Sequence, residues 1–288
     1  MRFFKPASRK GRGLTRFYGS AGFAACFGIF AICGFHSGAA AEELLLDVRE
    51  TSGFARGGAP TAHKIVLPKA VPRTTPFSLH DDRGNSVIAQ FSPANDDERQ
   101  DNWWLDFSAA LSPWQTRRYT VRYGPNVEAG SEGTGGHRLT QDEKLFQISN
   151  APYITWKVPR DLAGLLTSVE FPPVEHLLPE SPGLVLRDRE GREHVLGAGF
   201  HAGRVLRSGR RAVALGFHGD AKNAALDGVH STVELLFPSP VSWVEVDWTI
   251  DDPQSRVTGM CAALKLALDP PRSDAPTLVD FGAGTWVY

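Results

Sequence analysis

The sequence predicts an all-β protein of the sandwich or barrel kind. Short β-branched and aromatic runs recur along the chain with turn residues between them, as is typical of such folds. Glycine and proline, at 29 and 20 residues, are frequent enough to end many short strands. Long windows with the 3.6-residue apolar period of a helix are scarce, and we expect one helical turn, at residues 161–166.

The first element is a predicted signal peptide at residues 1–41. It has six basic residues and no acid, an apolar run over 21–35, and small residues at its end. These are the three parts of a secretory signal. The run is short and broken by glycine, which does not suit a membrane span. We expect cleavage after Ala41 and a secreted or periplasmic location; an uncleaved membrane anchor is the alternative.

The remaining chain is acidic. Removing six of the 31 basic residues leaves 25 against 32 acids, a net charge near −7. Such a chain has no surplus of cations for nucleic acid. It also lacks a Walker loop, a dinucleotide fingerprint and a G-x-S-x-G motif, which disfavours nucleotide and hydrolase-triad functions. Cys261 is the one cysteine left, so no internal disulfide is expected, and we interpret it as a buried apolar residue.

The first predicted domain covers residues 42–125. Its clearest turn is 81–85, where Gly84 can supply a positive φ between two strands. The expected strands are 64–67, 86–90, 103–107 and 118–123.

A predicted linker at residues 126–141 separates this domain from a second one at 142–288. The linker has almost nothing apolar to bury. The second domain includes an expected hairpin over 183–196 with its turn at Glu190-Gly191. Its other expected strands are 145–150, 231–237, 241–250, 259–268 and 277–280.

The order of motifs resembles one known family. Ile65-Val66-Leu67-Pro68, Asp81-Asp82-Arg83-Gly84 and Val87-Ile88-Ala89-Gln90 follow one another as in the N-terminal domain of the exo-rhamnogalacturonan lyase-like (PcRGLX/YetA-like) proteins. Phe146-x-Ile148-x-Asn150 and the 183–196 hairpin resemble that family's central domain. The resemblance covers most of the chain after the signal. It implies a RIFT-type β-barrel followed by a mutarotase-like supersandwich β-sandwich.

One departure from the family bears on activity. Its lyases carry their catalytic groups largely on a C-terminal α/α toroid, whereas this sequence has no helical array. The chain is therefore expected to be a truncated relative or to work through its β domains alone. No catalytic residue carries over, and the partner that the resemblance implies is a pectin-type polysaccharide or oligosaccharide.

The sharpest local feature is the strand around residues 243–252. Alternation places Trp243, Glu245 and Asp247 on one face, with the two carboxylates about 7 Å apart along the strand. An indole beside carboxylates suits sugar recognition, and the spacing also lies in the broad range that glycosidases use. The alternative is a charged strand face that discourages edge pairing. The opposite face, facing the core, holds Val244, Val246, Trp248 and Ile250.

Two other tryptophans, Trp103 and Trp114, are candidate sugar platforms. Trp103 and Trp104 point to opposite faces of one strand, so at most one of them can bind while the other packs. Trp114 lies in the turn 112–115, where an indole either stacks on a saccharide or covers the end of the barrel.

The second domain also holds groups for an alternative, enzymatic function. Elimination from a uronate needs a base for the α proton and a cation beside the carboxylate. His201 and Arg204, together with His218 and Lys222, are the candidate catalytic residues. Ordinary loop histidines are the alternative reading of this pattern.

No metal or other cofactor is expected. The sequence lacks H-E-x-x-H and paired cysteines, so no zinc site is predicted. Calcium on Asp251 and Asp252 with Glu245 and Asp247 is the alternative, although the D-x-D-x-D-G spacing is missing.

Three functions remain open. The one we prefer is an exported carbohydrate-binding or accessory protein related to pectin-acting lyases, without lyase activity of its own. The second is a small β-eliminating enzyme that uses the histidines of the second domain. The third is a structural or interaction protein of the cell envelope.

Overall fold

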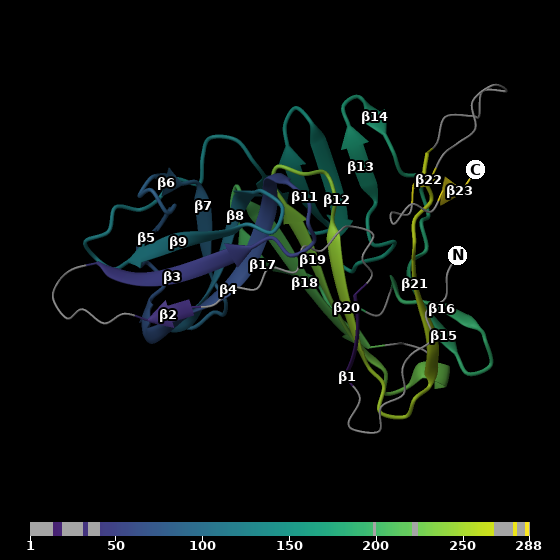
Figure 1. The fold of residues 1–288 in the computed structure, drawn as a ribbon. Helices are drawn as coiled ribbons and strands as arrows, with labels where there is room; N and C mark the ends of the chain where they lie inside the picture. Colours follow the sequence, from purple (N-terminus) through teal and green to yellow (C-terminus); the bar gives the residue numbers. More distant parts are fainter. Residues whose placement is uncertain are drawn as a thin grey trace.

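The computed structural model describes residues 41–197, 200–220 and 224–267 (Figure 1). It also gives the backbone of four short strands, β1 (Leu14–Tyr18), β2 (Ala31–Cys33), β22 (Val279–Asp280) and β23 (Trp286–Val287). In the described part every strand pairing is antiparallel and no α-helix occurs; a 3₁₀ turn spans Ala224–Leu226. The all-β prediction is confirmed. The predicted signal peptide, apart from Ala41 and the backbone of β1 and β2, lies outside the described residues.

The first body consists of two sheets. One has the strand order β2-β3-β9-β5-β6 and the other β4-β8-β7. Their bounds are β3 (Glu42–Arg49), β4 (Arg56–Pro72), β5 (Phe77–His80), β6 (Ser86–Val87), β7 (Ala89–Pro93), β8 (Arg99–Leu111) and β9 (Thr116–Tyr123).

Alternation explains why β3 lies where it does. Leu44, Leu46 and Val48 are buried in the core of the first body. Acids on the other face pair across the strands, as Asp47 does with Arg118 of β9 at 2.7 Å. A strand with one apolar and one charged face must place the apolar face against another sheet. The RIFT type of barrel itself stays a prediction, because no ladder between described strands joins the two sheets.

The second body contains three sheets, with orders β20-β19-β18-β17, β10-β11-β12-β13-β14 and β16-β15-β21; β1 adds to the first of these beside β20. The bounds are β10 (Arg138–Gln141), β11 (Leu145–Asn150), β12 (Ile154–Pro159), β13 (Ser168–Phe171), β14 (Val174–Glu175), β15 (Gly183–Asp188), β16 (Glu193–Val195), β17 (Arg204–Ser208), β18 (Ala212–Asp220), β19 (His230–Pro238), β20 (Glu245–Asp251) and β21 (Val257–Ala263).

The sheet of β17–β20 has an inner face that supplies much of this body's core. Val213, Leu215 and Phe217 of β18 alternate with polar or small residues, and β19 and β20 repeat the pattern. Their partners in the core come from the other two sheets, including Trp156 of β12 and Leu186 of β15. The second body is thus a set of sheets packed face to face around one apolar cluster.

Several predicted strands hold with adjusted ends. The hairpin is confirmed as β15 and β16, with Gly191 at φ +81 in its turn. The expected strand 241–250 begins only at Glu245, and 86–90 divides into β6 and β7 at Ile88. The strand expected at 277–280 has only Val279–Asp280, as β22, among the described residues.

Two sequence expectations are wrong in detail. Residues 161–166 form turns without a helix, and Leu162 and Leu165 have φ of 58 and 66, a conformation that no right-handed helix contains. The end of the predicted linker, Arg138–Gln141, is strand β10, paired with β11. Its Leu139 packs against the core, which gives this end of the segment an apolar contact that its polar composition does not suggest.

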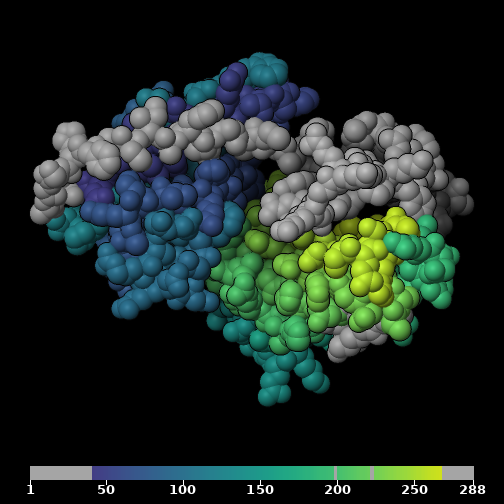
Figure 2. All heavy atoms as spheres, turned by 90° about the horizontal axis from the view of Figure 1, so that it is seen from below, coloured from purple at the N-terminus to yellow at the C-terminus, as the bar shows by residue number. Residues whose placement is uncertain are grey.

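The two bodies meet on the outer face of the β17–β20 sheet. There Ala212, Ala214 and Leu236 are buried as a small cluster, close to Pro60–Ala62 of β4 and Asp106 of β8. The side-chain amide of Gln90, on β7, accepts hydrogen bonds from the Arg211 and Ala212 N–H groups at 2.9 and 3.0 Å. Figure 2 shows the first body, in blue, beside the second body, in green and yellow.

Candidate functional site

The outer face of the β17–β20 sheet is covered at one end and open at the other. Burial decreases along β19 from Leu236 through half-buried Glu234 to exposed Thr232. The register places Ala214, Gly216 and then exposed His218 beside these residues on β18. We call the exposed end the open face. It comprises Asp247, Thr249 and Asp251 of β20, His230, Thr232 and Glu234 of β19, and Gly216, His218 and Asp220 of β18.

The predicted row on β20 lies at the boundary between the covered and open ends. Glu245 and Asp247 are exposed, whereas Val246, Trp248 and Ile250 pack on the core, so alternation along this strand is as expected. Trp243 precedes the strand and is 47% exposed. An indole and two carboxylates therefore lie close along the chain at the surface of the second body.

Glu234 of the neighbouring strand β19 adds a third acid to Glu245 and Asp247. It was not predicted from the sequence as a site residue. Its direct partner in the ladder is Asp247, so two acids lie opposite each other on the same face. Burial raises the pKa of the Glu234 carboxyl, and the charge of Asp247 raises it further. The Arg207 guanidinium, whose Nη2 is 3.9 Å from Oε1 of Glu234, offsets part of this increase. Two carboxyl groups side by side on one face offer several oxygens for hydrogen bonds with a ligand.

Arg207 forms the polar centre of the junction between the bodies. Its guanidinium is buried and donates to both carboxylate oxygens of Asp106, at 2.9 and 3.1 Å. The ring of Trp104 stacks on it, with 4.3 Å between the ring centroid and the guanidinium carbon. A buried ion pair of this kind fixes the orientation of the two packed bodies, because moving them apart would leave each charge buried without its partner.

The Asp106 carboxyl is held in an unusual state. Burial raises its pKa to about 6 despite the opposing effect of Arg207, and the nearby Glu234 and Glu245 raise it further. Asp106 and Glu234 thus share one buried cation. The sequence offered one sign of this site: Asp106 is the single acid within the apolar run Trp103–Phe107.

The predicted catalytic histidines lie together at the far end of the open face. The His201 and His218 rings are stacked with centroids 6.2 Å apart, and the His201 N–H donates to the His218 carbonyl. The register places exposed Arg204 opposite Gly216, two residues from His218 on the same strand face. Lys222, the fourth candidate, lies outside the described residues.

Two unpredicted residues extend this histidine patch. His230 Nδ1 is 2.6 Å from Asp220 Oδ1, and their strand positions are directly opposed. The Asp220 carboxylate raises the pKa of His230, and that imidazole in turn lowers the pKa of Asp220. The pair leaves Nε2 of an oriented imidazole for a ligand or a proton.

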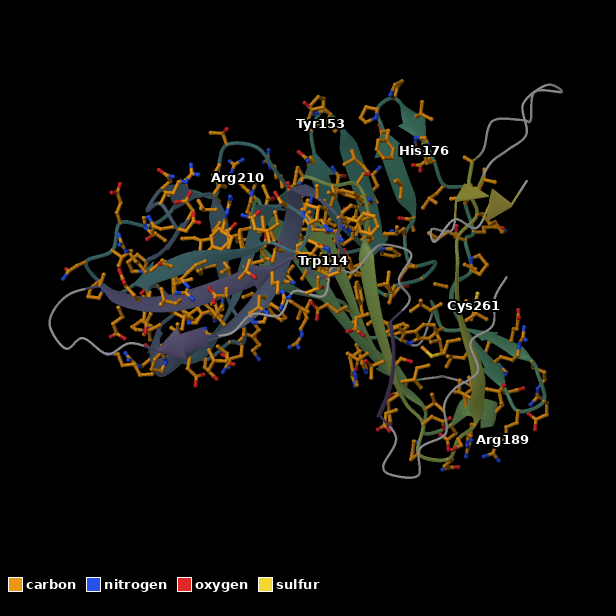
Figure 3. The ribbon with its side chains drawn as sticks, in the orientation of Figure 1. Trp114, Tyr153, His176, Arg189, Arg210 and Cys261 are labelled. Carbon is orange, nitrogen blue, oxygen red and sulfur yellow. The ribbon has the colours of Figure 1, made fainter. Side chains whose placement is uncertain are left out.

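The structure gives the three tryptophans of the first body different environments. Trp103 is 2% exposed and packs against Phe77 in the first core, so the prediction that it binds a ligand is wrong for this conformation. Trp104, on the opposite face of the strand, covers Arg207. Trp114 is 62% exposed, in the turn between β8 and β9 (Figure 3).

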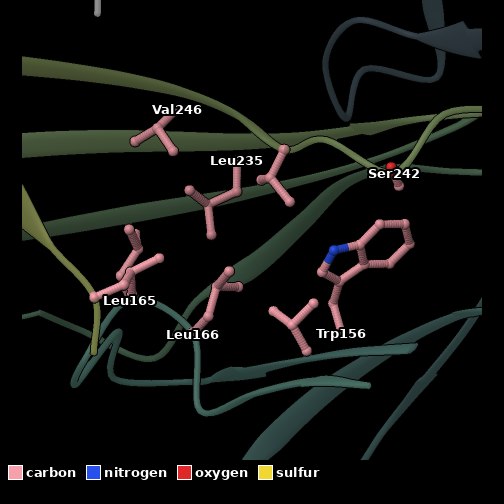
Figure 4. A pocket seen from close by; sticks show the side chains of 9 residues that line it. Trp156, Leu165, Leu166, Leu235, Ser242 and Val246 are labelled. Atoms are coloured by element: carbon pink, nitrogen blue, oxygen red, sulfur yellow. The ribbon is translucent and has the colours of Figure 1, made fainter. Parts of the chain in front are cut away.

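An apolar cavity of about 250 Å³ lies behind the Trp243 segment. Ser242 and Val244, the residues before and after Trp243, both line this cavity. The segment that carries the indole therefore packs against the interior of the second body. Its walls carry few polar atoms to bind sugar hydroxyls. Other residues around the cavity are Trp156, Leu165, Leu166, Leu235 and Val246 (Figure 4).

The described part of the chain holds neither a cluster of metal ligands nor a helix that could span a membrane. Within it, no three His, Cys, Asp or Glu side chains are arranged to bind a metal ion. The alternative calcium ligand Asp252 instead accepts the Val257 N–H at 2.8 Å through its Oδ2. The same residues include no helix with the length and hydropathy needed to cross a bilayer.

No protein-family model matches the chain, and a search of curated proteins finds no match. The resemblance to rhamnogalacturonan lyase-like proteins therefore stays a prediction.

Proposed function

We propose that this protein is an exported glycan-binding protein that serves as an accessory to polysaccharide breakdown and has no lyase activity of its own. The observation that carries the proposal is the surface row of Trp243, Glu245 and Asp247, with Glu234 opposite Asp247. An indole offers a flat apolar surface to a sugar ring, and carboxylates accept hydrogen bonds from its hydroxyls.

The position of this row supports the proposal. It lies where the first body stops covering the β17–β20 sheet, so a chain of sugar rings can extend from Trp243 along the open face. That face continues through Thr232, His218 and Asp220, which are exposed hydrogen-bonding side chains. The partner we propose is a pectin-type glycan, which follows from the sequence resemblance alone.

Binding to a panel of defined oligosaccharides and pectin fragments tests the proposal. We expect wild-type protein to bind at least one of them, and Trp243→Ala and Asp247→Asn each to weaken that binding about tenfold, which corresponds to about 1.4 kcal/mol. Tyr153→Ala is the matched control, because Tyr153 is an exposed aromatic residue on the β11–β12 turn and is not part of the row. Binding unaffected by Trp243→Ala would contradict the proposed site.

The histidine patch supports a second candidate, elimination from a uronate. His201 and His218 are stacked, and Arg204 is on the same strand face, so a base and a cation are near each other. Incubation with pectin fragments, read as ultraviolet absorbance of unsaturated uronate, separates the candidates. New absorbance that His218→Ala abolishes would replace the accessory function with a lyase function.

A further inference from the structure

The turn that carries Trp114 is held by an unusual set of contacts. Trp114 has φ 60, a conformation that a bulky residue adopts only when its surroundings require it. The turn is closed by the Gln115 N–H, which donates to the Ser112 carbonyl, and by the Ser112 N–H, which donates to the Gln115 side chain. The position of the indole is thus set by the hydrogen-bonded backbone of the turn and not by burial of the ring.

A buried carboxylate, Glu50, holds this backbone in place. Glu50 follows β3 directly, is 1% exposed, and its own N–H donates to the Gln115 carbonyl. Its two carboxylate oxygens accept hydrogen bonds from the Trp114 N–H at 3.2 Å, from the Gly53 N–H at 2.7 Å and from the Ser52 N–H at 2.9 Å. The Ser52 hydroxyl and the Arg56 guanidinium complete the set.

These donors keep the carboxyl ionised. Burial acts to raise the pKa of Glu50, but the hydrogen bonds from Ser52, Trp114 and Gly53 outweigh burial and lower the pKa to about 2. An acceptor that is ionised at every ordinary pH binds backbone N–H groups more strongly than a neutral one.

Gly53 provides the surface on which the indole rests. It has φ +78, and a Cβ atom built there would lie 2.9 Å from Cζ2 of Trp114. Only a residue without a side chain lets the ring approach the backbone this closely. The indole is therefore flanked by backbone at Gly53 and remains 62% exposed.

We propose that Trp114 is a second sugar-stacking platform in addition to the Trp243 row, and that Glu50 is its positioning residue. This inference rests on the proposed glycan-binding function. A side chain that is already ordered loses less entropy on binding, so a held indole binds a sugar ring more tightly than a free one. Two platforms on one chain also raise the affinity for a long glycan over that for a short one.

The size of the exposed apolar surface favours a sugar over a protein partner. A stable protein interface buries roughly 800 Å² on each side. Among the described residues of this turn and the neighbouring segment 50–56, only Phe54, 57% exposed, adds a large apolar side chain to that of Trp114. One or two rings match one or two pyranose units.

The test combines binding with ¹⁹F NMR of full-length protein labelled with 5-fluorotryptophan. The probe is whichever oligosaccharide of the panel binds the wild type, in a short and a long form. Trp114→Phe identifies the Trp114 resonance. We expect the glycan to shift that resonance, and Trp114→Ala to weaken binding of the long form by tenfold or more, with Tyr153→Ala as control.

Glu50→Gln tests positioning, because it keeps the shape of the side chain and removes its charge. We expect its Trp114 resonance to move toward that of a free indole and its glycan affinity to fall threefold or more, at a temperature where the variant is fully folded. The Trp243 resonance should not move. A residue that only stabilised the fold would leave the resonance and the affinity of the folded protein unchanged, which would overturn the role of Glu50.

The outcomes separate the two proposals. If Trp243→Ala weakens binding and Trp114→Ala does not, the proposed function stands and the second platform is overturned. If only Trp114→Ala weakens binding, the platform stands and the Trp243 row is wrong. If wild-type protein binds no glycan, the proposed function and the platform both fail. Should Glu50→Gln not fold, Trp114→Ala still decides the inference.

Discussion

Two carboxyl groups of the first body are both almost inaccessible to solvent, and yet their pKa values shift in opposite directions. Glu50 receives hydrogen bonds from Ser52, Gly53 and Trp114, and its pKa is lowered to about 2. Asp106 faces one cation, Arg207, in the company of Glu234 and Glu245, and its pKa is raised to about 6. Burial raises the pKa in both cases. The hydrogen bonds to Glu50 outweigh it, whereas at Asp106 the one cation does not outweigh burial and the two neighbouring acids.

The comparison separates a local site from a long-range one. Glu50 is held by neighbours two and three residues along the chain and by a turn that the β3–β9 pairing brings close. The partner of Asp106 is 101 positions away, in the other body. A carboxylate whose hydrogen-bond donors are near it in sequence determines the shape of a turn. A carboxylate whose partner lies in the other body depends on the contact between the two bodies.

The largest expected effect follows from removing the cation. Arg207→Met leaves Asp106 buried with two acids and no positive partner, which typically costs about 3–5 kcal/mol of unfolding free energy. Urea denaturation at pH 7 measures it. Arg204→Met, on an exposed position of the same strand, should cost about 0.5 kcal/mol or less. Equal losses for the two variants would show that the pair contributes nothing specific.

A smaller effect concerns pH. Asp106 has a folded pKa of about 6, above its ordinary value of 3.8, so the stability it contributes is complete below about pH 4 and is lost as pH rises through 6. The stability difference between wild type and Asp106→Asn should therefore change by about 2–3 kcal/mol over this window, to the disadvantage of the wild type. Urea denaturation from pH 4 to 8 measures it, and a change of opposite sign would mean that Arg207 outweighs burial.

The smallest effect is at the Glu50 site. Gly53→Ala adds a Cβ at φ +78 and only 2.9 Å from the Trp114 ring, whereas Gly58→Ala adds one at φ +87 with nothing within 4 Å. The backbone cost of about 1–2 kcal/mol is common to both variants. Any further loss in thermal unfolding of Gly53→Ala measures the indole contact. Identical losses would show that the ring moves aside without cost.

Local patterns in the sequence predicted the strands well where one face is apolar. The β15–β16 hairpin, with Gly191 in its turn, and the alternation of β20 both hold. The helical turn at 161–166 was wrong, because Leu162 and Leu165 reach the core through turns with positive φ. Apolar spacing alone cannot distinguish these two ways of burying the same leucines.

The candidate site was predictable only along single strands. Trp243, Glu245 and Asp247 are close in sequence, so alternation was sufficient to group them. Glu234 and the Asp220–His230 pair enter through cross-strand register, which no local pattern encodes. Trp103 was misassigned because alternation shows that two tryptophans face apart but not which of them faces the core.

The amino-acid sequence alone determined that this chain forms sheets, since side-chain alternation and turn residues act over a few positions. Only the tertiary structure decided which charges meet. Arg207 and Asp106 are far apart in the chain and become partners because two sheets pack, and Trp114 is held because Glu50 lies beside its turn. Electrostatic and hydrogen-bond energies depend on distance in space and on burial, and neither is defined before the chain has folded.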